Sequence, residues 1–427
     1  MKKSLLILLF TCWALFFAAF RPVMPFAAET AAFPDGTPVT GGRILMGTIG
    51  EPSNLIPYMA SDSASGEITG LLYVAPLKYD KDLNVVPWAA ASYEVLEGGR
   101  LLRFVLRDDI RWEDGVPLTA DDVEFTYKLM IDPKTPTAYS GDFLAIESFK
   151  KTGRLSFEVR YAKPFARSLM TWMGAILPKH VLEGQDIMTT PVARKPIGAG
   201  PYRLAKWDAG SMLTLTASDT YFEGRPNLDE VVYRIIPDPS TMFLELKAGK
   251  LDMMSLSPQQ YLRQTQGPQW ERDWRKYRYL SFSYTFLGFN LEHPFFKDVR
   301  VRRAISMAID RQSLIDGVLL GQGVPTVGPY KPGTWAYNDK LTPVRQDVDE
   351  ARRLLDEAGW KKNKDGLLER DGKPFLFTIL VNQGNDSRIK AAIIIQSQLK
   401  ALGITVHIRT VEWAAFIKEF VNKGHFD

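Results

Sequence analysis

The chain has 427 residues, which is long enough for two or three domains at about 150 residues each and for a large hydrophobic core. Hydrophobic residues make up 45% and charged residues 24%, an ordinary globular composition that excludes a disordered or collagen-like chain. The formal net charge is only +4, so the charge gives no support for a nucleic-acid partner. Aromatic residues reach 12%, which suits either a recognition surface or large cores.

The N-terminus has the pattern of an export signal. Two lysines precede an apolar run over residues 5–20, as in the charged and hydrophobic regions of a signal peptide. Small residues at Thr30 and Ala32 predict a signal peptide over 1–32, and cleavage after Ala28 is the alternative. No later stretch approaches the roughly 20 apolar residues of a membrane-spanning helix, so one uncleaved anchor is the most that the sequence allows.

The single cysteine, Cys12, lies inside this apolar run. A lipid-bearing cysteine would end the run and follow small residues, so we do not expect a lipoprotein. After cleavage the mature chain would have no cysteine. That excludes disulfides, thiolate metal sites and cysteine nucleophiles.

The rest of the sequence predicts mixed helices and strands without repeats or low-complexity segments. Residues 43–48 and 101–106 have the composition of strands. Thr119 and Asp122 predict a capping box, with Asp122 in the place of the usual glutamate. The helix that they begin, over about 120–130, should end before the Asp-Pro pair that follows.

The C-terminal third contains the clearest predicted unit. Asp298 should cap one helix, and apolar spacing predicts another over 351–358 that ends at a glycine. A strand over 375–381, a helix over 387–402 and an alternating strand over 404–408 come last. A strand, a crossover helix and a strand imply parallel pairing of the two strands.

The motifs of nucleotide-driven and hydrolytic chemistry are absent from the sequence, including the phosphate-binding loops, the serine elbow and the zinc-protease helix. None of the four histidines lies within helical ligand spacing of another; they are His180, His293, His407 and His425. His407 falls on the polar face of its strand, where a solvated role is favoured over metal ligation. We expect neither a metal nor a cofactor.

Two pairs of adjacent carboxylates and one glycine-rich stretch have structural interpretations. The pair at 108–109 ends a predicted strand, and the pair at 121–122 lies in the first turn of a helix, where acids complement the helix dipole. Acid–base catalysis by either pair is the less favoured alternative. The stretch Gly198-Ala-Gly-Pro201 is interpreted as a tight turn into a strand and not as a phosphate loop.

Three amide side chains follow the first strand of the last unit. Ligands of open parallel sheets bind outside the carboxyl ends of the strands, and the strand ending at Val381 brings Asn382, Gln383 and Asn385 to that edge. Amides can donate and accept hydrogen bonds directly or through water, as a permissive binding site requires. The alternative is a simple exposed connection.

Read in order, the landmarks resemble those of the extracellular solute-binding proteins of ATP-driven importers, in particular the peptide- and nickel-binding family 5. The resemblance covers essentially all of 41–427. Its most recognisable segment is Arg107-Asp-Asp-Ile-Arg-Trp-Glu-Asp-Gly-Val-Pro-Leu-Thr-Ala-Asp-Asp-Val123. The other matching segments begin at Gly41, Glu51, Leu77, Gly198, Tyr221, Leu246, Asp298, Ala308 and Ala351.

This resemblance implies an α/β, bilobal periplasmic-binding-protein fold (cluster C type) with an extra inserted domain. Domain I would comprise 33–78 and 197–285, domain II 79–196, and domain III 286–427. The implied function is capture of a peptide between two lobes and delivery to an inner-membrane ABC permease complex, without covalent chemistry. The protein would be periplasmic and monomeric, with no nucleic-acid partner.

The resemblance also suggests ligand-binding residues outside the last unit. Ser61, Asp62 and Ser63 correspond to the loop of the family that lines the cleft from domain I. Such a loop could pair with an extended peptide through its backbone. Tyr139 and Trp413 correspond to wall and stacking residues. The structural alternatives are a solvated loop for the serine stretch and core packing for the two aromatic rings.

Members of the family continue beyond the position of Asp427, with a Gly-Trp and an Asp-Tyr segment and a return to the first domain. The resemblance therefore implies a shortened member with an incomplete domain III that binds poorly alone. In peptide binders the missing stretch supplies the Asp that holds the ligand's α-ammonium group. A shortened but functional variant is the alternative.

Two competing functions remain open at the level of sequence. Within the binding class, the solute could be a nickel chelate, haem or an oligosaccharide, because a fold does not fix its ligand. From another class, a secreted hydrolase of peptides or sugars could assemble a serine triad in space. Peptides that stay intact while binding saturably would favour the binding protein.

Overall fold

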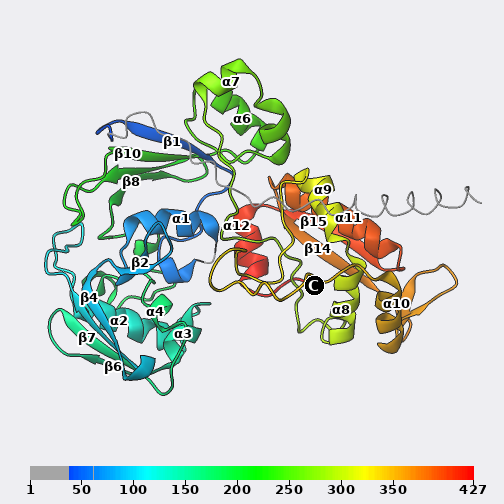
Figure 1. Ribbon diagram of the computed structural model, residues 1–427, viewed down its shortest axis with the longest axis horizontal. Helices are drawn as coiled ribbons and strands as arrows, with labels where there is room; N and C mark the ends of the chain where they lie inside the picture. The colour runs from blue at the N-terminus through cyan, green and yellow to red at the C-terminus, as the bar shows by residue number, and fades with distance from the viewer. Residues whose placement is uncertain (1–37, 61) are drawn as a thin grey trace, which may run out of the picture.

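The computed structural model describes residues 38–60 and 62–427, which form two bodies of helices and sheets lying side by side (Figure 1). The predicted signal peptide, 1–32, and Ser61 lie outside the described residues. Blue to green segments form the first body, and yellow to red segments form the second (Figure 1). Within the described part of the chain, no helix is long and apolar enough to cross a membrane.

The upper sheet of the first body joins the start of the described chain to a segment far along it. Strand β1 (Arg43–Thr48) pairs in parallel with β10 (Glu230–Ile235). Antiparallel pairing continues through β9 (Met212–Ala217) to β8 (Tyr202–Asp208). The strand predicted over 43–48 is confirmed; β10 is its neighbour in the strand order, and an isolated parallel bridge joins Met46 to Met253 on its other side.

The turn before β8 requires glycine at two positions. A Cβ on Gly198 would lie 1.9 Å from the carbonyl oxygen of Leu72, and one on Gly200 would lie 2.5 Å from that of Leu71. The N–H of Gly200 donates to the carbonyl oxygen of Leu72 at 2.8 Å. The glycines therefore serve close backbone packing, and the stretch 198–201 leads directly into β8, as predicted.

The lower sheet of the first body is antiparallel and has the order β4-β5-β7-β6. Its strands are β4 (Ala90–Leu96), β5 (Leu101–Leu106), β6 (Ile146–Lys151) and β7 (Ser156–Tyr161). Helix α2 (Ala120–Ile131) begins with the predicted capping box. The Thr119 hydroxyl accepts the N–H of Asp121 at 3.2 Å, and the Asp122 carboxylate accepts the N–H of Thr119 at 2.8 Å. The predicted strand over 101–106 and the predicted capping box are both confirmed.

Shorter elements connect the two sheets of the first body. They are α1 (Ser63–Leu72), β2 (Leu77–Tyr79), β3 (Val85–Pro87), α3 (Ser140–Leu144), α4 (Ser168–Thr171) and α5 (Lys179–Leu182). One hydrophobic core extends through both sheets, from Leu55 ahead of α1 to Phe157 in β7 and Leu213 in β9. The predicted domains I and II would therefore share a core, and their boundaries remain a prediction.

The second body is built around two parallel strands and four helices. They are α8 (Val299–Ala308), α9 (Arg311–Leu319), α10 (Val348–Glu357), β14 (Leu376–Asn382), α11 (Asp386–Lys400) and β15 (Thr405–Val411). The register runs from Leu376 opposite Thr405 to Asn382 opposite Val411. The predicted strand, helix and strand are confirmed, with boundaries moved by one to three residues. A small meander of β11 (Lys361–Lys362), β12 (Leu368–Arg370) and β13 (Lys373–Pro374) precedes them.

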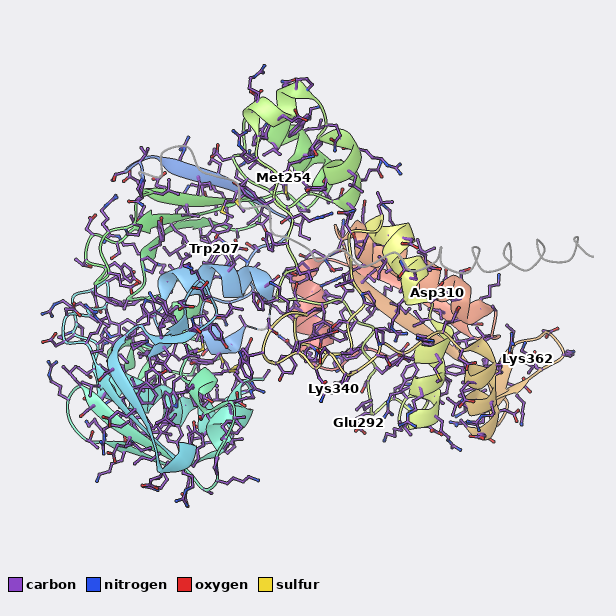
Figure 2. All side chains as sticks on the ribbon, in the orientation of Figure 1. Trp207, Met254, Glu292, Asp310, Lys340 and Lys362 are labelled. Carbon is purple, nitrogen blue, oxygen red and sulfur yellow. The ribbon has the colours of Figure 1, made fainter. Side chains whose placement is uncertain are left out.

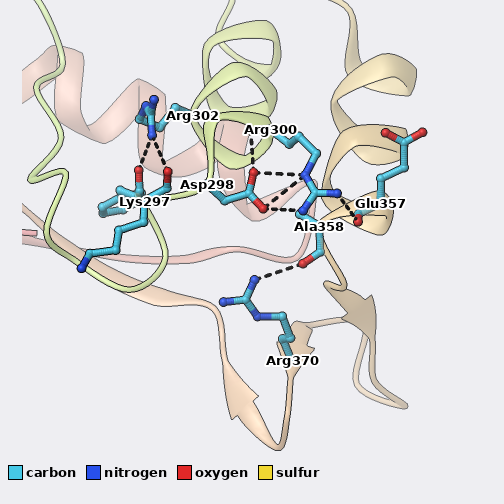
Figure 3. Close-up of polar contacts among 8 residues, drawn as sticks. Lys297, Asp298, Arg300, Arg302, Glu357, Ala358 and Arg370 are labelled. Carbon is cyan, nitrogen blue, oxygen red and sulfur yellow. Dashed lines mark hydrogen bonds and ion pairs between the residues drawn. The ribbon is translucent and has the colours of Figure 1, made fainter.

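Two arginines tie the carboxyl end of α10 to its neighbours (Figure 3). Arg300 donates to the carbonyl oxygen of Glu357 at 2.7 Å, and Arg370 donates to that of Ala358 at 3.0 Å. Asp298 caps α8 as predicted by accepting the N–H of Arg300 at 2.9 Å. Hydrogen bonds from the Arg300 guanidinium also lower the pKa of Asp298. Cations at these orphan carbonyls favour the helix dipole and fix α10 against α8.

A smaller unit of the first body rises above the upper sheet in Figure 1 and contains α6 (Pro239–Lys247) and α7 (Pro268–Asp273). A π-helix, η4 (Gln260–Gln264), lies between them in the sequence. The unit has a small core of its own, in which the rings of Phe243 and Trp270 stack with centroids 5.6 Å apart. Its base contains Met254, labelled in Figure 2.

The capping box provides a test of the first body. Asp122→Ala leaves the N–H groups of Thr119 and Lys179 without the carboxylate that accepts them at 2.8 and 2.9 Å. We expect the free energy of unfolding to fall by about 2 kcal/mol, against about 1 kcal/mol for Thr119→Ala. Chemical denaturation measures both. Glu124→Ala on the same helix is the control, and a loss for Asp122→Ala no larger than for this control would contradict the assignment.

Candidate ligand-binding cleft

An open cleft of about 1020 Å³ lies between the α6 side of the first body and the α9–α11 side of the second. The end of β1, helix α6 and residues 253–264 supply its first wall. The carboxyl end of α9 and the start of α11 supply the second wall. In Figure 1, α6 lies in the unit at the top, and α9 lies below it and to the right. A ligand in the cleft would contact both bodies.

Uncharged hydroxyl and amide groups supply much of the polar lining. They belong to Ser240, Ser255, Ser257, Gln259, Gln260, Gln264, Asn385 and Ser387. Gln260 is held in place, because its side chain accepts the N–H of Ser257 at 2.8 Å and donates to the carbonyl oxygen of Pro239 at 3.3 Å. The other groups can offer donors and acceptors to the amides of a ligand.

The charged side chains of the lining are balanced. Glu67 and Lys247 come from the first body, and Asp386 and Lys390 from the second. Among the described residues there is no group of three or more histidine, cysteine, aspartate or glutamate side chains that could hold a metal ion. Because its charges balance, the cleft suits a ligand without a large net charge.

The three amides predicted from sequence have different positions. Asn385 lines the cleft and caps α11, accepting the N–H of Arg388 at 3.0 Å. Asn382 is buried and accepts from the Arg388 guanidinium at 2.8 Å, and burial lowers the pKa of this arginine. Gln383 is exposed and its N–H donates to Val411 at 2.7 Å. Only Asn385 is placed in the cleft lining; Asn382 supports the edge from beneath.

Asp62 fixes the loop that was predicted to line the cleft from the first body. Its buried carboxylate accepts the N–H and the hydroxyl of Ser65, both at 2.8 Å, and also the hydroxyl of Ser53. Ser63 begins α1 and is exposed. Because these hydrogen bonds occupy its carboxylate, Asp62 stabilises the start of α1. Ser63 remains exposed to solvent.

Tyr139 lies against the same loop. Its hydroxyl donates to the carbonyl oxygen of Ala60 at 3.2 Å, and its ring meets the edge of Tyr58 with centroids 6.1 Å apart. Burial and the negative charge of Asp62 raise the pKa of Tyr139. The ring is still 46% exposed, so it covers the loop and offers a surface to a neighbour. The structure thus brings Tyr139 to Ala60, close to Asp62.

Trp413 contacts the first body at Gly50. A Cβ on Gly50 would lie 2.9 Å from Cδ1 of the Trp413 ring, so the ring fills the space of the missing side chain. The indole N–H is buried and has no hydrogen-bond partner in the described part of the chain. A second close approach joins the same two bodies, because a Cβ on Gly384 would lie 2.6 Å from the carbonyl oxygen of Pro237. Trp413 therefore lies where the two bodies meet.

Sequence reasoning missed the wall formed by α6 and residues 253–264. The available signal was chemical, because the stretch Ser255-Leu-Ser-Pro-Gln-Gln260 carries side-chain amides, as the predicted edge at 382–385 does, together with two hydroxyls. It comes shortly after the segment beginning at Leu246, which carried part of the family resemblance. Nothing local indicated that it faces the second body.

The chain belongs to family 5 of the bacterial extracellular solute-binding proteins. It matches the family model described as "Bacterial extracellular solute-binding proteins, family 5 Middle" over residues 84–427. The predicted resemblance is confirmed, and so is the bilobal α/β fold, because solved structures of this class share it.

Individual relatives agree with this assignment. The oligopeptide-binding protein AppA of Bacillus subtilis (strain 168) is 34% identical over 401 residues, which cover 92% of this chain and 73% of AppA. The structure of AppA with a nonapeptide has a TM-score of 0.81 at 33% identity, covering 90% of this chain and 77% of that one. NikZ of Campylobacter jejuni with Ni(L-His) has a TM-score of 0.75 at 28% identity, covering 87% and 74%.

The contact between Gly50 and Trp413 can be tested by a single added methyl group. In Gly50→Ala the Cβ forces the Trp413 ring to move, and such overpacking costs about 1–3 kcal/mol. Gly66→Ala is the matched control, because Gly66 is exposed in α1 and a Cβ there meets nothing within 4 Å. Chemical denaturation should show a loss for Gly50→Ala and a small gain for Gly66→Ala. Equal stability of the two variants would contradict the contact.

Proposed function

We propose that this protein is the substrate-binding component of an ATP-driven peptide importer. It captures peptides in the cleft between its two bodies and delivers them to a membrane permease. The observation that carries the proposal is the lining of the cleft, where uncharged hydroxyls and amides from one body face the start of α11 in the other. Such groups satisfy peptide backbones without reading particular charged side chains.

The relatives support a peptide as the solute. AppA, at 33% identity in its solved form, is in complex with a nonapeptide. The cleft volume of about 1020 Å³ is at the upper end of ordinary small-molecule sites, which fits an extended ligand of several residues. Binding would favour the arrangement in which both walls touch the peptide, so closure is a population shift.

Further properties follow as parts of the same proposal. The permease complex would lie in the inner membrane, and the binding protein would work as a monomer in the periplasm after loss of its signal peptide. It would carry no lipid anchor and would not act as an enzyme. The absence of a cysteine outside the predicted signal peptide fits an exported protein without a thiol nucleophile.

A nickel chelate is the second candidate solute, because NikZ at 28% identity is in complex with Ni(L-His). No histidine is found among the described residues that line the cleft of this chain. A peptide is the favoured ligand, because AppA, in complex with a nonapeptide, is the more similar of these two proteins. Nickel would have to bind as a chelate whose own atoms coordinate the metal.

Blocking the cleft should abolish peptide binding. Ser255 is an exposed residue of the cleft wall, and Ser255→Trp would fill space that a peptide backbone occupies. We expect isothermal titration of the chain with a random nonapeptide pool to show saturable binding that this variant loses by at least about tenfold. Mass spectrometry of the pool should show every peptide intact.

Ser148→Trp is the matched control, because Ser148 is exposed on β6 in the lower sheet and does not line the cleft. It should bind the pool as the unmodified chain does. Absence of binding by the unmodified chain would contradict the proposed function. Equal binding by both tryptophan variants would move the site away from the cleft, and cleaved peptides would favour a hydrolase.

A further inference from the structure

Methionines are concentrated in the wall of the cleft that the first body supplies. Four of the 13 methionines in the sequence line it: Met46, Met242, Met253 and Met254. Met242 is buried, while Met253 is 50% exposed. Methionine is flexible and polarizable, so a wall of this kind adapts to apolar side chains of different shapes.

A leucine in an unfavourable backbone conformation lines the opposite wall. Leu320 ends α9 with φ 50° and ψ 42°, in the left-handed region. A side chain with a Cβ is disfavoured there, and glycine is the usual residue at such a helix end. Gly321, which follows directly, also has a positive φ of 75°.

Its position in the cleft distinguishes Leu320 from the other non-glycine residues with a positive φ. The described non-glycine residues with positive φ are Leu83, Glu97, Leu320 and Asp371. Of these, Leu320 alone lines the cleft. Strained residues persist where the surroundings or a ligand require them, so an observed outlier in a binding cleft points to a role in binding.

The charges of the cleft do not select a charged side chain. Each body contributes one acidic and one basic residue to the lining, Glu67 with Lys247 and Asp386 with Lys390. The lining thus has no net charge to favour an anionic or a cationic ligand side chain. Discrimination between ligand side chains must therefore come from the apolar surfaces of the two walls.

We infer that the cleft selects peptides carrying a large apolar side chain, which is held between the methionines of the first body and Leu320 of the second. This inference rests on the proposed function and names the class of peptide that the same cleft prefers. Burial of such a side chain against both walls would also link ligand choice to closure, because neither wall alone can cover it.

Two nonapeptide pools test the preference. One contains Ala, Ser and Gln at random, and the other is identical except for one Leu at a random internal position. We expect calorimetric titration of the unmodified chain to show at least about tenfold tighter binding of the Leu pool. Leu320→Gly and Met253→Gln should each reduce this ratio severalfold.

Stability measurements separate a binding role from a structural one. Leu320→Gly removes backbone strain, so its melting temperature should stay the same or rise while the preference for Leu falls. Leu83→Gly is the control, because Leu83 has a φ of 65° outside the cleft lining. It should leave both affinities unchanged.

Each outcome decides between the alternatives. Equal affinity of the unmodified chain for both pools would overturn the apolar preference while leaving the proposed function in place. Failure of both pools to bind would overturn the proposed function and this inference with it. A preference that persists in both Leu320→Gly and Met253→Gln would show that other residues carry it.

Discussion

The packing of Trp413 against Gly50 is the constraint on which the candidate site depends. The two bodies have separate hydrophobic cores, so their relative position is decided where they touch. At this point an indole ring occupies the space of an absent side chain, and Gly384 approaches the backbone of Pro237 in the same manner. Contacts made through glycine permit close approach while burying little surface. Such a junction suits two bodies that must change their separation.

The loop that follows Gly50 connects this junction to the rest of the first body. Asp62 gathers Ser53 and Ser65 around one buried carboxylate, which fixes the loop where α1 begins. Tyr139 then covers the loop from the lower part of the body through its bond to Ala60. The two sheets of the first body share one core, and the unit that contains the α6 wall packs its own small core against Leu45 of β1. Movement on binding is expected between the bodies and not within the first.

Local signals in the sequence predicted much of the secondary structure. The capping box at Thr119 and Asp122 and the strand–helix–strand unit ending at β15 are confirmed because their determinants lie within a few residues of one another. The pairing of β1 with β10 had no such signal, because the partner lies on the far side of the inserted lower sheet. The shared core of the first body could not be predicted for the same reason, because it joins residues that lie far apart in the sequence.

The candidate site was only partly predictable. Asn385 was placed by a rule about the carboxyl ends of parallel strands, and it does line the cleft. The same rule could not distinguish it from Asn382, which is buried beneath Arg388. The wall that contains Met253 was missed, because tertiary packing alone brings it opposite α9. The left-handed conformation of Leu320 has no sequence signature other than the glycine that follows it.

The most direct test of the account is the distance between the two bodies in solution. The only cysteine of the sequence is Cys12 in the predicted signal peptide, so spin labels can be introduced selectively at exposed Lys250 and Ile393. Pulsed dipolar spectroscopy should show a broad distance distribution that shortens and narrows with a saturating nonapeptide, while a pair at Ser148 and Lys250 stays constant. An unchanged Lys250–Ile393 distribution at saturation would contradict closure of the two bodies around a peptide.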